Sequence, residues 1–208
     1  MQVGLPVEGV APSGSMIGWI VGITIAVLVV GFFVWRQWFE TYHLATVDPG
    51  RLYRDGNRSV REFANMLRRV RPRTIVALLE EPEWTNPRKP EFAQELELLR
   101  GRADVKLEKI PVRLGGWPEP QAIEQFLAIA SDPSRQPVVV HCAQGVRRTG
   151  MMVAAYQMSV LGWSRERARS RVLAFGHSMQ TISDVIRFID VYDPQARRMT
   201  VSLELSRE

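Results

Sequence analysis

One stretch of the chain is apolar at every position. Residues 16–35 read MIGWIVGITIAVLVVGFFVW and carry no charge. At about 1.5 Å per residue, a helix of this length spans roughly 30 Å, the thickness of the hydrocarbon core of a membrane. A buried helix of a soluble domain normally keeps a polar stripe, which is missing here, and tryptophans near both ends suit the membrane interfaces. We therefore expect residues 16–38 to form a transmembrane anchor.

The charges around this stretch predict its orientation. No lysine or arginine precedes it, whereas Arg36, Arg51 and Arg54 follow it. A cleaved signal peptide is the alternative, but a basic leading segment and an A-x-A site are both missing. The sequence thus predicts a single-pass membrane protein with its N-terminus outside and the domain after the helix in the cytoplasm. We expect a disordered tail at residues 1–15 and a connector at residues 39–48.

Beyond the connector, short branched apolar runs alternate with segments of helical periodicity. Strands are expected at residues 74–79, 105–112 and 137–141, and helices at residues 90–100, 121–129, 149–161, 165–175 and 181–191. This alternation favours an α/β domain with a mainly parallel central sheet flanked by helices. Nothing divides the segment, so we expect one domain over residues 49–194 and a C-terminal tail over residues 195–208.

Composition narrows the possible functions. Charged residues make up 24% of the 208 residues and hydrophobic ones 46%, as in a globular chain. The single cysteine excludes an internal disulfide and a thiolate zinc cluster, and it fits a reducing compartment. The net charge of +5 comes almost wholly from arginine, which can hold phosphate or lie beside anionic lipid, although solvated helix faces give the same count. No metal or cofactor is expected, and the lack of interleaved aromatic and basic residues argues against nucleic-acid binding.

The strand-like run at residues 137–141 leads into a loop, and residues 141–150 read HCAQGVRRTG. Backbone N–H groups in a loop that ends at a helix N-terminus can cradle a phosphate group. Gly145 permits a backbone conformation that a side chain would block. Arg148 can hold two phosphoryl oxygens with its fork. In such a setting the thiol pKa of Cys142 falls from about 8.5 into a range of roughly 3.5–7.5, so that Cys142 becomes a thiolate.

The thiolate of Cys142 can attack a phosphate monoester to give a phosphocysteine, which water then hydrolyses. Thr149 can donate a hydrogen bond to the departing sulfur, and the His141 ring is expected to hold the loop backbone. Taken singly, a cysteine ending an apolar strand is more often a buried small residue, but the joint pattern favours a phosphate-binding loop. The expected catalytic residues are Cys142, Arg148 and Thr149, and the expected phosphate-binding residues are Ala143, Gln144, Gly145, Val146, Arg147 and Arg148.

These residues resemble the signature of the protein tyrosine phosphatase superfamily, His-Cys-x5-Arg-Ser/Thr-Gly. Six positions after Cys142 comes Arg148, followed by Thr149 and Gly150. Residues 47–54, VDPGRLYR, are similar to the segment that opens the bacterial dual-specificity-like phosphatases. The resemblance covers most of the chain from residue 47 onward. It implies a cysteine-phosphatase-like fold and hydrolysis of phosphotyrosine or phosphoserine/threonine in proteins, or of a membrane phospholipid.

The resemblance also implies an aspartate general acid in an Asp-x-Gly-x-Pro setting, a group worth about 10²–10⁴ in rate. Aligned on Gly116 and Pro118, this position is Leu114, which cannot donate a proton. Residues 117–119 (WPE) are similar to the Trp-Pro-Asp string of the receptor-type and cytosolic tyrosine phosphatases. Glu119 is therefore a candidate acid, although it can equally begin the next helix and complement its dipole. The other candidates are Asp55, Glu80, Glu81 and Glu83.

The missing aspartate leaves a second function open. A phosphatase-like module that binds phosphorylated partners at the membrane without turning them over needs no acid. The presence of both Cys142 and Arg148 argues against such a module, since a pure binder has no use for a nucleophile.

Overall fold

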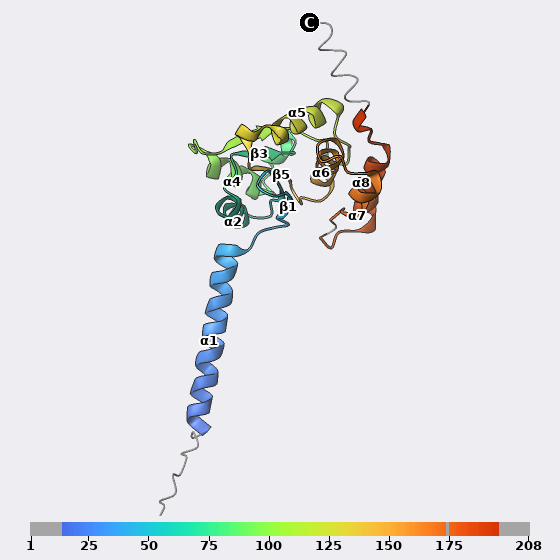
Figure 1. Cartoon of the computed structure of the whole chain (residues 1–208). Coiled ribbons are helices and arrows are strands. Elements are labelled where there is room, and N and C mark those ends of the chain that lie inside the picture. Colours follow the sequence, from blue (N-terminus) through green and yellow to red (C-terminus); the bar gives the residue numbers. More distant parts are fainter. Residues whose placement is uncertain (1–13, 174, 196–208) are drawn as a thin grey trace, which may run out of the picture. The chain divides into compact units, whose positions relative to one another are not determined.

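The computed structural model describes residues 14–173 and 175–195 (Figure 1). The chain divides into two compact units, Met1–Glu40 and Thr41–Glu208. The tails expected at residues 1–15 and 195–208 lie almost wholly outside the described residues.

The described residues of the first unit form one long helix, α1 (Gly14–Phe39). Its segment Met16–Phe39 is long and apolar enough to cross a membrane. The hydroxyl of Thr24 donates to the carbonyl of Ile20 at 2.8 Å, so this polar group is satisfied within the helix. The apolar helix expected from the sequence is therefore present.

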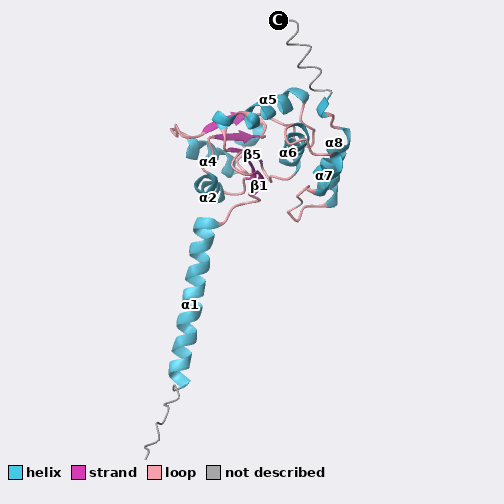
Figure 2. Cartoon of the chain, viewed as in Figure 1, coloured by secondary structure: helices cyan, strands magenta, loops and turns pink. Residues whose placement is uncertain are grey.

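The second unit is built around one β-sheet with helices on both faces (Figure 2). The strands are β1 (Ala45–Asp48), β2 (Leu52–Gly56), β3 (Thr74–Ala77), β4 (Lys106–Lys109) and β5 (Val138–Cys142). The helices are α2 (Val60–Val70), α3 (Glu81–Trp84), α4 (Pro90–Leu99), α5 (Pro120–Ser131), the 3-10 turn η1 (Pro133–Arg135), α6 (Arg147–Ser159), α7 (Arg165–Ser170) and α8 (Met179–Val191).

The order of the strands places β5 at the centre of the sheet. The five strands follow the order β1-β2-β5-β3-β4, with β1 antiparallel to β2 and the other pairs parallel. Gly56 at the end of β2 lies opposite Cys142, and Ala77 at the end of β3 lies opposite His141. The loop after β5 therefore emerges where three parallel strands end, the edge at which open α/β sheets bind ligands. This confirms the predicted α/β fold with a mainly parallel sheet.

Alternating side chains of the strands pack into two different hydrophobic clusters, one on each face of the sheet. Val138 and Val140 point into a cluster with residues of α5, α6 and α8, whereas Val139 packs with Phe63 of α2 and Leu99 of α4. Figure 1 shows α6 and α8 on one side of the strands and α2 and α4 on the other. Because both faces are covered, β5 reads as an unbroken apolar run, as expected for a buried parallel strand.

Some elements differ from the sequence predictions. Residues 45–48 of the expected connector form β1, which pairs with β2 across a tight turn. The helix expected at residues 165–175 ends at Ser170, and it buries only Ala168. Helix α2 was not expected, although Phe63, Met66 and Leu67 line one face of it and the Ser59 hydroxyl caps its first turn. Because α2 also contains several arginines, its apolar stripe was not recognised from the sequence.

Candidate active site

The loop between β5 and α6 depends on a glycine. Gly145 has a φ of +68°, and a Cβ added there would lie 2.3 Å from the carbonyl oxygen of Asp55. A side chain is therefore excluded both by the backbone conformation and by the close approach to β2. Cys142 begins the loop with 3% of its surface exposed, and the N–H of Gly145 donates to its Sγ at 3.2 Å.

Every carbonyl of the loop has a donor. The N–H of Asn57 donates to Ala143 O (3.0 Å), the Nδ1 of His43 bonds to Gln144 O (2.7 Å), the Nη2 of Arg54 donates to Gly145 O (2.6 Å) and the N–H of Gly150 donates to Val146 O (2.8 Å). In a trans peptide unit the C=O and the following N–H point in opposite directions. Holding the carbonyls by the surrounding chain therefore turns the N–H groups to the other side, where Cys142 lies. N–H groups arranged in this way can hold an anion.

His43 is a site residue that sequence analysis placed only in the connector. Its ring is stacked between Tyr42, at a centroid distance of 3.9 Å, and Phe175, at 4.3 Å. Burial, together with the charges of His177 and two arginines, lowers the pKa of His43, although its bond to Gln144 acts in the opposite sense. The ring is neutral at pH 7, and its Nδ1 carries the proton because a carbonyl can only accept. His43 also adopts a φ of 62°, which is uncommon for a residue with a side chain.

Arg54 is a second residue behind the loop. It is 3% exposed, projects from β2, and places its guanidinium over the ring of Phe175 at 5.5 Å. Burial lowers the pKa of Arg54 to about 10, while the charge of Cys142 acts to raise it. Among the described residues no carboxylate forms an ion pair with Arg54. It lies in the segment VDPGRLYR, where sequence analysis noted it without assigning it a role at the site.

Arg148 is fixed in the first turn of α6 by a partly buried carboxylate. Its two terminal nitrogens donate to the two oxygens of Glu83 at 2.6 and 2.8 Å, and Nη1 also donates to Leu78 O and Val112 O at 3.0 and 3.3 Å. Burial acts to raise the pKa of Glu83, but the bonds to Arg148 lower it overall. Glu83 is therefore ionised at neutral pH. It orients the arginine and has no proton to donate.

These groups make Cys142 acidic. Burial raises the pKa of the Cys142 thiol, but the charge of Arg148, the hydroxyl and N–H of Thr149 and the N–H of Gly145 together bring the pKa below its ordinary value. Thr149 is fully buried in the first turn of α6. Cys142, Arg148 and Thr149, predicted from the sequence as a catalytic set, are thus brought together.

His141 acts on the loop through two other residues. Its Nε2 lies 3.0 Å from a carboxylate oxygen of Glu95, and the second oxygen of Glu95 accepts from the Nδ2 of Asn57 at 2.6 Å. Burial acts to lower the pKa of His141, but Glu95 raises it overall. Since Asn57 donates to Ala143 O, the chain of contacts runs from His141 to the loop backbone. Neither Glu95 nor Asn57 carried a recognisable signal in the sequence.

Cys142 lies in a pocket of about 370 Å³. The other residues lining the pocket are Glu83, Asn86, Lys89, Phe92, Leu114, Ala143, Gln144, Arg147, Arg148 and Thr181. Gly145 and Val146, which the sequence placed among the phosphate-binding residues, lie in the loop but not on this wall. Leu114 is on the wall with 69% of its surface exposed. The position where an acid was expected is thus at the site, and it is apolar.

The structure does not bring Glu119 to Cys142. Glu119 is exposed at the N-cap of α5 and does not line the pocket. Its place at the start of a helix fits the alternative role of complementing the helix dipole. Asp55 is buried, Glu80 accepts from the N–H of Leu114 at 2.7 Å, and Glu81 lies 3.5 Å from Lys109. Among the described residues that line the pocket, Glu83 alone bears a carboxyl group.

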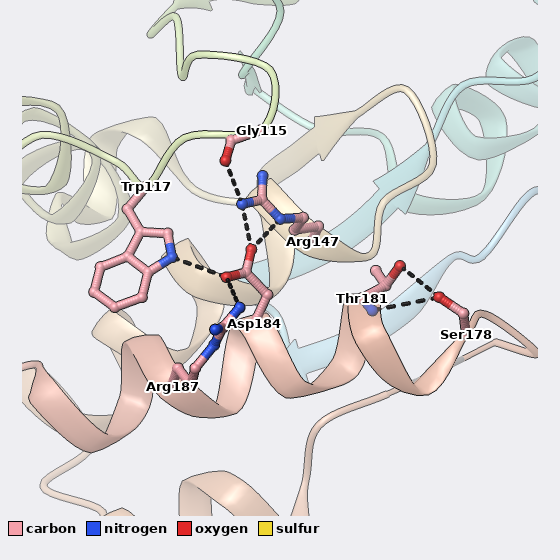
Figure 3. A network of polar contacts seen from close by, with 7 residues as sticks. All are labelled: Gly115, Trp117, Arg147, Ser178, Thr181, Asp184 and Arg187. Carbon is pink, nitrogen blue, oxygen red and sulfur yellow. Dashed lines mark hydrogen bonds and ion pairs between the residues drawn. The ribbon is translucent and has the colours of Figure 1, made fainter.

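Arg147 is neutralised by an aspartate of α8 (Figure 3). Asp184 pairs with the guanidinium of Arg147, and its other oxygen accepts from Trp117 Nε1 at 3.2 Å and Arg187 Nη2 at 3.1 Å. Burial acts to raise the pKa of Asp184, but these donors lower it overall. Arg147 also donates to Gly115 O at 2.7 Å. This network fixes the segment that contains Leu114 beside the pocket.

We expect the reactivity of Cys142 to depend on His43. In the full chain in detergent micelles, the rate of alkylation by iodoacetamide as a function of pH should give an apparent thiol pKa below about 8.5. His43→Ala removes the donor to Gln144 O, so the loop N–H groups lose alignment. One hydrogen bond is worth about 0.5–1.5 kcal/mol, so the pKa should rise by up to about one unit. His177→Ala is the matched control, since His177 touches His43 edge-on without reaching the loop. Equal profiles for all three proteins would contradict this role.

Comparisons with known proteins identify a family and several relatives. Residues 47–198 match the family described as DSP-PTPase phosphatase fused to NAD+ kinase. The dual specificity protein phosphatase TpbA of Pseudomonas aeruginosa is 23% identical over 146 residues, which are 67% of this chain and 60% of TpbA. A probable chloroplastic NAD kinase 2 of Oryza sativa subsp. japonica is 28% identical over 69 residues, which are 33% of this chain and 7% of that protein. The chain thus spans 60% or less of these curated relatives.

Solved structures give the same fold. The core catalytic domain of the PP-IP phosphatase SIW14 from S. cerevisiae, in complex with citrate, superposes with a TM-score of 0.60 at 20% identity, over 80% of this chain and 95% of that one. A cysteine-to-serine variant of P. aeruginosa TpbA in complex with phosphotyrosine gives a TM-score of 0.58 at 19% identity, over 80% and 96% of the two chains. At these identities the likeness shows the fold alone.

Proposed function

The chain belongs to the family described as DSP-PTPase phosphatase fused to NAD+ kinase, and on that premise we propose that it is a membrane-anchored, cysteine-dependent phosphatase of phosphate monoesters. One observation carries this proposal: the sulfur of Cys142 accepts an N–H of a loop whose carbonyls are all held by other groups. A buried thiol in that position is acidified by the same groups that would hold a phosphoryl dianion.

The geometry supports a two-step reaction. A phosphoryl group takes its place against the loop N–H groups and the N-terminus of α6, with Arg148 beside it. The thiolate of Cys142 attacks phosphorus, so that an S–P bond forms while the P–O bond to the leaving group breaks. Water then attacks the phosphocysteine, the S–P bond breaks, and the hydroxyl of Thr149 stabilises the thiolate that departs. Glu83 keeps Arg148 oriented through both steps.

The residues that line the pocket determine which leaving groups can depart. Leu114 cannot donate a proton, and Glu83 is ionised in its pair with Arg148. The leaving oxygen must therefore depart largely unprotonated, or take its proton from water. A phenolate, whose conjugate acid has a pKa of about 10, leaves far more readily than the alkoxide of serine, threonine or a lipid. Phosphotyrosine is accordingly the favoured substrate, ahead of phosphoserine, phosphothreonine and phospholipid.

A generic aryl phosphate distinguishes a phosphatase from a module that only binds phosphorylated partners. The full chain in micelles should hydrolyse para-nitrophenyl phosphate with inhibition by vanadate, and Cys142→Ser should abolish turnover because serine is not ionised at neutral pH. Glu119→Gln is the control, and its pH–rate profile should match that of the wild type. Tight vanadate binding without any turnover would replace the phosphatase by the alternative, a module that captures phosphorylated partners.

A second experiment tests the leaving-group argument. With one peptide sequence carrying phosphotyrosine or phosphoserine, the wild type should favour phosphotyrosine by at least about 10² in kcat/KM, since a general acid contributes about 10²–10⁴. Leu114→Asp should narrow this gap by raising the rate on phosphoserine, whereas Leu114→Asn, which matches it in size but cannot ionise, should not. Equal rates on both peptides in the wild type would mean that an acid does act in the pocket.

The apolar helix α1 supports a location of this reaction at a membrane. We propose that α1 crosses it with residue 1 outside and Thr41–Glu208 in the cytoplasm, because the basic residues follow the helix. Protease added to intact spheroplasts should then leave the domain whole, whereas protease added to inverted vesicles should digest it. Detergent-lysed cells serve as the control for access. Digestion in spheroplasts and protection in inverted vesicles would reverse the orientation.

A further inference from the structure

A second cavity lies behind the loop, away from Cys142. It has a volume of about 300 Å³ and is enclosed by residues of β1, β2, α6 and the α7 region. We name it the α7 cavity. It shares no lining residue with the pocket that contains Cys142. Its volume is at the lower end of the range of about 300–1,000 Å³ that small-molecule sites occupy.

The charges around the α7 cavity have one sign. Arg54, Arg167 and Arg171 line it, and none of its lining residues is an aspartate or a glutamate. Among the described residues none of these three arginines forms an ion pair with a carboxylate. This differs from the pocket around Cys142, where Arg148 has Glu83 and Arg147 has Asp184. Three guanidinium groups line the α7 cavity without a carboxylate to pair with them, which favours an anionic ligand.

Arg54 brings one buried charge to the wall of the α7 cavity, whereas Arg167 and Arg171 are exposed. Arg54 is 3% exposed, and its Nε has no acceptor among the described residues. Its other contacts are carbonyl oxygens of the loop and the ring of Phe175. The charge of Cys142 favours the charged form of Arg54, but no carboxylate among the described residues forms an ion pair with it, so the desolvation of this buried guanidinium is only partly offset. An anion in the α7 cavity would add a charged partner on the side of Arg54 that lines the cavity.

The remaining wall suits a small organic group. Val153 and Leu173 provide apolar surface, and Gln157 provides an amide. The ring of Trp163 forms a further side and is itself covered by Arg167 at 4.1 Å. We propose that the α7 cavity binds a small phosphate monoester, with the phosphate between Arg54, Arg167 and Arg171 and the organic part against Trp163. This site is separate from the one that contains Cys142.

The single cysteine of the chain allows the two sites to be distinguished. Alkylation of the full chain with iodoacetamide places an adduct on Cys142 alone and fills the pocket of the proposed reaction. Calorimetric titration of this alkylated protein in micelles should then report binding at the α7 cavity. Two probes that both carry a phosphate monoester are used. Glycerol 3-phosphate represents a soluble ligand, and dihexanoyl phosphatidic acid represents a lipid. Saturable binding of either probe at one site per chain supports the proposal, and the tighter probe identifies the source.

Variants on the α7 region decide whether this binding belongs to the cavity. Arg167→Gln combined with Arg171→Gln should weaken binding at least tenfold, whereas Arg169→Gln should leave it unchanged. Arg169 is on the same helix but pairs with Asp190 at 2.8 Å and does not line the cavity. If the double glutamine variant does not fold, Arg167→Lys with Arg171→Lys keeps the charge and should bind more weakly than wild type, since lysine cannot fork onto phosphate. The proposal fails if the alkylated wild type binds neither probe, or if the variants at residues 167 and 171 bind as tightly as the wild type.

Discussion

The opposed directions of C=O and N–H in a peptide unit govern the site. A phosphate-binding loop needs its N–H groups turned inward, so its carbonyls must turn outward, into the protein, and each then needs a donor. Here the donors come from widely separated parts of the chain: His43 before the sheet, Arg54 on β2, Asn57 after β2 and the first turn of α6. The loop therefore keeps its shape only when β2 and β5 are paired and the segment before β1 is in place.

Charge pairing sets the second constraint. Both arginines at the pocket have their own carboxylates, Glu83 for Arg148 and Asp184 for Arg147. A pair of this kind fixes the direction of a guanidinium before any ligand arrives, which is the condition for electrostatic stabilisation without reorganisation. It also reduces the net positive charge of the pocket. Binding of a dianion must then rely more on the loop N–H groups and on the helix N-terminus than on free arginine charge.

The sequence predicted the parts of this structure whose signal is local. The apolar runs of β3 and β5 and the spacing from Cys142 to Arg148 can be recognised from neighbouring residues alone. The partners of the loop cannot, because Gln144 and its donor His43 are 101 positions apart. Glu119 shows the limit of a local likeness, because the string suggested an acid while the structure places Glu119 at the start of α5, outside the residues that line the pocket.

The position of His43 bears on how the segment after α1 and the loop after β5 are related. Only three residues separate it from Phe39, the end of α1, so the segment that follows this helix is the same one that holds Gln144 O. A truncation at residue 47 would remove the anchor and this donor together. Loss of activity in such a fragment would not distinguish a need for the membrane from a need for the His43 contact. The connector is thus part of the site, and His43 within it adopts a left-handed backbone conformation, which is uncommon for a residue with a side chain.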